Sequence, residues 1–127
     1  MPEFKDWMRM AESDLETAYF LLNAREESLG YVFYLAQQGA EKALKSYMLF
    51  NGMPIIKTHD LMGLLEKCIN IEPNFEKFKY KLSIINPYST ATRYPDDHFV
   101  MPDVTTARLL LNDAQELFEF VQDKLNA

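Results

Sequence analysis

The stretch YLAQQGAEKALKSYM, residues 34–48, decides the fold of this chain. Its apolar residues recur at intervals of three and four, which places them on one face of an α-helix, and the same spacing extends back to Leu29. Three further apolar residues widen the stripe: Leu35, Leu44 and Met48. The sequence therefore predicts a helix that is buried on more than one side. Asn51 and Gly52 end it, because both accept the left-handed backbone of a helix C-cap.

Helical spacing recurs on both sides of this segment. Apolar residues step by three or four from residue 7 to residue 22 and from residue 107 to residue 125. Thr58 is predicted to cap a further helix, and Asp103 is predicted to cap the last one. The inner face of the helix after Thr58 consists of Leu61, Leu64, Leu65 and Cys68. The chain is thus expected to be an all-α bundle of four to five helices.

The pattern of residues 73–85 fits both a helix and a strand. Pro73 suits the first turn of a helical segment, and Phe75, Phe78, Leu82 and Ile85 share one helical face. However, KFKYKL at residues 77–82 also alternates as a strand does. Asn86 and Pro87 stop the segment, and residues 86–102 are interpreted as a long loop.

Composition bounds the class of protein. The chain has 127 residues and 14.8 kDa, of which 48% are apolar, so one domain over residues 1–127 is expected. The formal net charge is −6. A generic nucleic-acid coat would be basic, because neutralised phosphates supply most nonspecific affinity. Any contact with nucleic acid therefore needs a local basic patch or a dimer that builds one.

Cysteine usage and hydropathy indicate a location. Cys68 is the single cysteine, so no intrachain disulfide can form, as is usual in a reducing cytoplasm. No segment approaches the roughly 20 apolar residues that cross a bilayer. A cytoplasmic protein without a membrane segment is predicted.

Several familiar sites are missing from the sequence. There is no Gly-rich phosphate loop, no HExxH and no paired-cysteine motif. Two histidines and one cysteine cannot build a usual zinc site in one chain. Neither His59 nor His98 has a glutamate three residues before it, which a carboxylate-bridged bundle site would need. No metal and no cofactor are predicted.

The long loop contains RYPDDH, residues 93–98. Arg93 offers a fork of donors suited to phosphate oxygens, and His98 can move a proton near neutral pH. The pair is a minimal set for phosphodiester cleavage without metal. Equally, Asp96 or Asp97 could simply pair with Arg93 in water.

A second polar cluster lies on the helix that includes residues 34–48. Its members are Gln37, Gln38, Glu41, Lys42 and Lys45. Glu41 and Lys45 are four residues apart and can form an ion pair along the helix. Alternatively, Gln38 and Lys42 face a ligand or a second subunit across a polar groove. His59 is interpreted as structural, with its ring bonded to a backbone carbonyl.

These motifs resemble the HEPN family of small helical proteins. The matching stretches are AESDLETA (11–18), YLAQQGAEKALKSYM (34–48), KTHDLMGLLE (57–66) and ATRYPDD (91–97). The resemblance implies an up-down bundle that forms a homodimer. It also implies a minimal nucleotidyltransferase partner, often in a toxin-antitoxin pair. Many members are metal-independent RNases with an Arg-x(4–6)-His motif, whereas others bind nucleotides.

Two functions remain open at this point. The first is a dimer that binds a nucleotide or an RNA phosphate with Arg93, Tyr94, Gln38, Lys42 and Lys45. The second is an endoribonuclease with Arg93 and His98 as catalytic residues, which have the four intervening residues of the RNase motif. The RNase motif commonly has a polar residue after its arginine, where this chain has Tyr94. Pro95 and the two aspartates also depart from it, so the binding protein is favoured.

Overall fold

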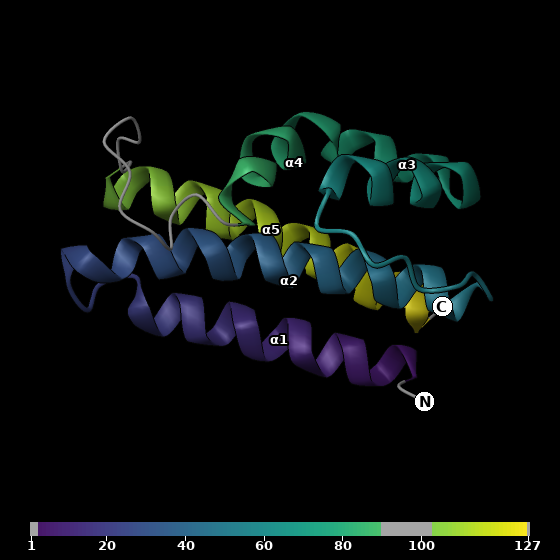
Figure 1. The fold of residues 1–127 in the computed structure, drawn as a ribbon, viewed down its shortest axis with the longest axis horizontal. Helices are drawn as coiled ribbons and strands as arrows, with labels where there is room; N and C mark the ends of the chain where they lie inside the picture. Colours follow the sequence, from purple (N-terminus) through teal and green to yellow (C-terminus); the bar gives the residue numbers. More distant parts are fainter. Residues whose placement is uncertain (1–2, 90–102, 127) are drawn as a thin grey trace.

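The computed structural model describes residues 3–89 and 103–126, and within these ranges the chain forms helices and connecting turns (Figure 1). The α-helices are α1 (Phe4–Leu21), α2 (Leu29–Phe50), α3 (Leu61–Ile71), α4 (Lys79–Ile85) and α5 (Val104–Leu125). Three short 3-10 helices accompany them: η1 (Glu26–Ser28), η2 (Pro73–Phe78) and η3 (Asn86–Ser89). These described residues contain no strand, which confirms the all-α bundle. None of these helices combines the length and apolar character needed to cross a membrane.

Helix α2 lies at the centre of the bundle. In Figure 1 it runs antiparallel to α1, and α5 lies behind it in the same direction as α2. Helices α3 and α4 form a shorter layer on the side opposite α1. Helix α2 contacts all four other α-helices, which is the burial on several sides that its wide apolar stripe predicts.

Small residues let α1 approach α2 closely. Leu15 on α1 is 1% exposed and packs over Gly39 on α2. A Cβ atom added to Gly39 would lie 2.7 Å from Cδ2 of Leu15, which is closer than packed carbons approach. Alanines surround this contact on both helices at 0–1% exposure: Ala11, Ala18, Ala36, Ala40 and Ala43. Glycine and alanine thus set the distance between the two helices.

The predicted helix ends are partly correct. The side chain of Asp103 accepts a hydrogen bond from the backbone N–H of Thr106 at 2.9 Å, which confirms the cap of α5 and lowers the pKa of Asp103. The predicted Thr58 cap is wrong. Helix α3 begins at Leu61, and Asp60 caps it by accepting from the N–H of Met62 at 3.1 Å. Thr58 lies two residues too early, so its hydroxyl accepts from the N–H of Asp60 instead.

The segment that also matched a strand is helical. Pro73 begins η2, and α4 follows without a break. Phe78 and Leu82 are four residues apart and both are buried, whereas Lys77 and Lys79 are exposed. The spacing of four matches the core, so it prevails over the alternation of KFKYKL. Gly52 has a φ angle of 79°, which confirms the predicted end of α2.

Candidate functional site

Helix α2 carries a row of polar side chains inside the protein. Gln37 is 0% exposed, Gln38 9%, Glu41 3% and Lys45 5%. Charged and amide side chains are rarely this buried unless they are paired, because an unpartnered polar group away from water is costly. The row must therefore be held by its own hydrogen bonds.

Glu41 is the centre of that network. Its Oε2 atom accepts from Nζ of Lys45 at 3.0 Å, which confirms the predicted ion pair. Its Oε1 atom accepts from Nε2 of Gln37 at 3.3 Å. Gln38 donates through Nε2 to Oε1 of Gln37 at 2.8 Å, so the chain of bonds runs the length of the row.

His59 joins the network from the connection between α2 and α3. Its ring Nδ1 lies 2.9 Å from Oε1 of Glu41, and its backbone carbonyl accepts from Nε2 of Gln37 at 3.0 Å. The ring partner is thus a carboxylate, and the interpretation that it bonds a backbone carbonyl is wrong. The sequence spacing does not indicate that His59 meets Gln37 and Glu41, because His59 follows Glu41 by 18 residues across a turn.

Two lysines of the row, Lys42 and Lys45, contact helix α1. Nζ of Lys42 lies 2.6 Å from Oδ2 of Asp14, and 16% and 18% of these side chains are exposed. Nζ of Lys45 lies 5.7 Å from the centroid of the Trp7 ring, within range of a cation–π contact. Nε1 of Trp7 is the one buried side-chain nitrogen or oxygen in the described part of the chain that lacks a hydrogen-bond partner.

The structure brings together three of the predicted ligand-binding residues. Gln38, Lys42 and Lys45 lie along α2, and Lys42 is the most exposed of them. Arg93, Tyr94 and His98 lie outside the described residues, as do Asp96 and Asp97. Nothing described therefore tests the predicted convergence of Arg93 with the row.

Just before that segment, the chain contacts the start of α3 and the first turns of α2. Asn86 donates through Nδ2 to Oδ1 of Asp60 at 3.1 Å and accepts at Oδ1 from the N–H of Leu61 at 2.8 Å. Tyr88 then stacks on Phe33 of α2 with ring centroids 4.7 Å apart. Burial raises the pKa of the Tyr88 hydroxyl. The end of η3 is thus fixed to α2 about one and a half turns before Gln38.

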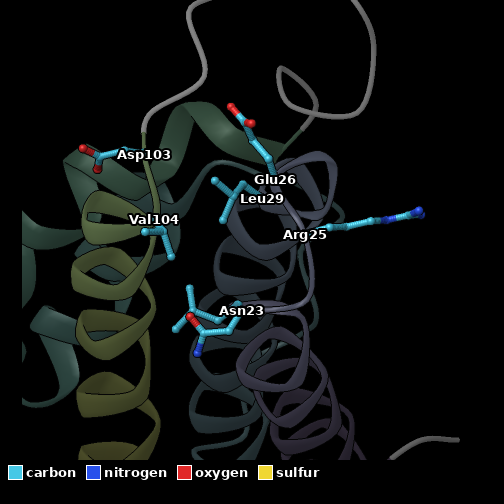
Figure 2. Close-up of a pocket in the computed structure, with 7 residues that line it drawn as sticks. Asn23, Arg25, Glu26, Leu29, Asp103 and Val104 are labelled. Atoms are coloured by element: carbon cyan, nitrogen blue, oxygen red, sulfur yellow. The ribbon is translucent and has the colours of Figure 1, made fainter.

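Other kinds of site find less support. A hollow of about 470 Å³ lies where α2 and α5 begin, and Figure 2 shows the residues that line it. Its lining residues are Leu22, Asn23, Arg25, Glu26, Leu29, Asp103 and Val104. The Arg25 side chain points away from it, so few polar groups converge there. Across residues 3–89 and 103–126, no group of three or more His, Cys, Asp or Glu side chains could hold a metal ion.

The fold is thus a helical bundle in which the central helix carries a buried polar row and packs against two long helices and two shorter ones. The HEPN domain profile matches residues 4–124, and the chain therefore belongs to the HEPN family.

Solved structures agree with this assignment. The crystal structure of TT1696 from Thermus thermophilus is similar at 27% identity, with a TM-score of 0.81 over 98% of this chain and 99% of that one. ST0689, an archaeal HEPN homologue, is similar at 25% identity, with a TM-score of 0.78 over the same shares. No curated protein matches the chain.

Proposed function

We propose that this HEPN protein is a cytoplasmic homodimer that binds the phosphate of a nucleotide or an RNA. In this proposal it works with a minimal nucleotidyltransferase partner in a toxin-antitoxin pair. The proposal makes Arg93 the principal anion contact, because a guanidinium binds two phosphate oxygens at once. Tyr94 would stack on a base.

The stacking of Tyr88 on Phe33 is the observation that carries this proposal. It fixes the chain on α2 five residues before Arg93. Five residues of extended chain span at most about 17 Å. Gln38 lies only about 7.5 Å along the helix from Phe33. Arg93 is therefore within chain reach of the Gln38 end of the polar row, which supports a site there. Lys42, nine residues from Phe33, lies on the opposite face of α2, where it pairs with Asp14 of α1.

The described residues divide the remaining roles. The Lys42 side chain is 16% exposed, so it can contact a ligand at the surface while it is paired with Asp14. Gln38 and Lys45 are buried and already bonded to neighbours, so they would support the site from within. A rigid inner network holds contact residues in place at little cost in entropy when a ligand binds.

Uncovered apolar residues on two helices support the homodimer. Tyr31 on α2 is 56% exposed and Leu109 on α5 is 60% exposed. Exposed aromatic and aliphatic side chains are typical of protein interfaces. Light scattering should therefore give twice the 14.8 kDa mass of one chain at micromolar concentration.

Calorimetry tests the function directly. Wild-type protein is titrated with a panel of nucleoside mono-, di- and triphosphates and with short RNA at physiological salt. Saturable binding of at least one of them is expected. If none binds, the proposal that this protein recognises phosphate is wrong.

The spacing of Arg93 and His98 favours one alternative, a metal-independent endoribonuclease. Arg93 would stabilise the transition-state anion and His98 would transfer a proton. The net charge of −6 and the two aspartates between these residues weaken this alternative, because acidic groups repel an RNA backbone.

A further inference from the structure

A groove runs along helices α1 and α5. Two adjoining hollows of about 520 and 420 Å³ form it, and both are lined by Glu12, Phe118 and Gln122. At one end the Tyr19 hydroxyl donates to Oδ1 of Asn112 at 2.7 Å and joins the two helices. From this bond to the first turn of α1 the groove is about 22 Å long.

The floor of the groove is apolar. Phe118 on α5 is 4% exposed, and Met8 and Leu125 are partly buried against the core. Both of the latter line the larger hollow. An apolar floor between two helices can receive the apolar stripe of a third helix. A helix of about 15 residues matches the length of the groove.

Three exposed carboxylates line the smaller hollow and form its acidic rim: Glu12 and Glu16 on α1, and Glu119 on α5. Glu12 and Glu16 are one turn apart, and like charges at this spacing destabilise a helix. Across residues 3–89 and 103–126, no cationic side chain forms an ion pair with any of the three. The repulsion is therefore uncompensated within this part of the chain.

The charge on α5 acts across the groove. Burial raises the pKa of the Tyr19 hydroxyl on α1, and the negative charge of Glu119 on α5 raises it further. The described side chains include no cluster that could hold a metal ion. Ammonium or guanidinium groups that are spaced along a helix match this spread charge better than a single ion does. Lys5 and Arg9 line the other end of the groove, so the basic residues of such a helix belong at the Tyr19 end.

We propose that the groove between α1 and α5 binds a basic amphipathic helix of a partner protein. The apolar stripe of that helix packs on Met8 and Phe118, and its lysine or arginine side chains pair with the acidic rim. The inference goes beyond phosphate recognition and does not depend on it, since no residue of the groove belongs to the polar row on α2.

A synthetic helix is the probe. It is a fluorescein-labelled peptide of about 15 residues in which leucines occupy one face and lysines the other. Its partner probe has glutamate in place of every lysine. Fluorescence anisotropy at physiological salt should show saturable 1:1 binding of the basic peptide and none of the acidic one. Absence of saturable binding by the basic peptide would overturn the proposal.

Two triple variants with the same change in net charge locate the contact. Glu12→Gln/Glu16→Gln/Glu119→Gln removes the acidic rim and should weaken binding on the order of tenfold. The control is Glu27→Gln/Glu66→Gln/Glu76→Gln, which changes exposed carboxylates on other elements and should bind as wild type does. Equal losses in the two triples would mean that the peptide is attracted by net charge alone, and the proposal would be wrong.

A further variant tests the groove without changing its charge. Gln122 is exposed on α5 and lines both hollows, so Gln122→Trp should occupy the space of the helix and abolish binding. Lys67→Trp on the exposed side of α3 is its control. Undiminished binding by Gln122→Trp would exclude the groove as the site. Circular dichroism should show wild-type helicity in both variants.

Two more readouts separate a partner helix from other occupants. The methyl signal of Met8 should shift when the basic peptide is added, whereas that of Met62 on α3 should not. An unmoved Met8 signal would overturn the proposal. Light scattering should give one mass for wild type and both triple variants. A changed mass in the acidic-rim triple alone would make the groove an interface between copies of this chain instead.

Discussion

Nζ of Lys45 lies 3.0 Å from Oε2 of Glu41, with only 7% and 4% of the two side chains exposed. Desolvation of such a pair costs several kcal/mol per ion, about as much as the attraction returns, unless other hydrogen bonds satisfy the remaining atoms. Gln37 and His59 satisfy Oε1 of Glu41. The pair is therefore stable because Lys45, Gln37 and His59 together satisfy both oxygens of Glu41. The same bonds connect α2 to the segment before α3.

Removal of Lys45 should expose how strongly the pair is coupled. Lys45→Met leaves Glu41 buried without a counter-charge and should lower the free energy of unfolding by about 3 kcal/mol. In Lys45→Met/Glu41→Gln the uncompensated charge is gone, so the loss should be smaller than in the single variant. Urea denaturation followed by circular dichroism measures both. A single variant as stable as wild type would mean that the pair is not buried in solution.

Gly39→Ala tests the close approach of α1 to α2. The new Cβ would lie 2.7 Å from Cδ2 and 2.8 Å from Cγ of Leu15, so Leu15 or α1 must move. A loss of about 1–3 kcal/mol in the free energy of unfolding is expected for such overpacking. Gly63→Ala on the exposed side of α3 is the control, since its nearest contact is Oδ2 of Asp60 at 3.3 Å. It should change stability by less than about 1 kcal/mol, and equal effects of the two variants would contradict the packing.

Cys68 should be unreactive in the folded protein. Burial raises the pKa of its thiol to about 12, so almost no thiolate exists at pH 8. A thiol-reactive dye should label native protein slowly and unfolded protein at once. The unfolded thiol has a pKa of about 8.5. The folded state therefore keeps its full stability below that pH, and it loses free energy of unfolding as pH rises from there toward 12, because the unfolded thiol ionises first. Immediate labelling of the native protein would place Cys68 outside the core.

Local signals in the sequence sufficed for most of the fold. The period of three and four residues on α2 depends only on neighbours along one helix, and so does the capping of α5 by Asp103. Gly52 ends α2 because its backbone conformation is a property of a single residue. Such features require no knowledge of which helix packs on which.

The candidate site depended on packing that spacing does not encode. Asp14 and Lys42 are 28 residues apart and meet because α1 lies against α2. His59 meets Glu41 only because the connection after α2 folds back along that helix. The sequence therefore identified most of the polar residues on α2 and the ion pair of Glu41 with Lys45. It identified neither the burial of these residues nor their partners outside α2.

His98→Ala separates binding from cleavage. The proposed function predicts that wild type leaves RNA intact in the presence of a chelator and that the variant binds nucleotide or RNA nearly as well as wild type. An RNase would instead cut RNA with chelator present, and loss of the proton-transfer group would slow it by about 10²–10⁴-fold. Gel analysis of labelled RNA with both proteins distinguishes the outcomes. Chelator-resistant cleavage that the variant loses would establish the alternative.

The most direct test of phosphate recognition is the affinity of Arg93→Ala for the nucleotide or RNA that wild type binds, measured by calorimetry. Loss of a charge-assisted contact should weaken binding by about 1–3 kcal/mol with little change in melting temperature. Arg9→Ala is the matched control, since Arg9 is a surface arginine on α1 that pairs with Asp6, and it should bind as wild type does. Equal affinity of Arg93→Ala and wild type would contradict the account, and a large fall in melting temperature would make Arg93 a structural residue instead.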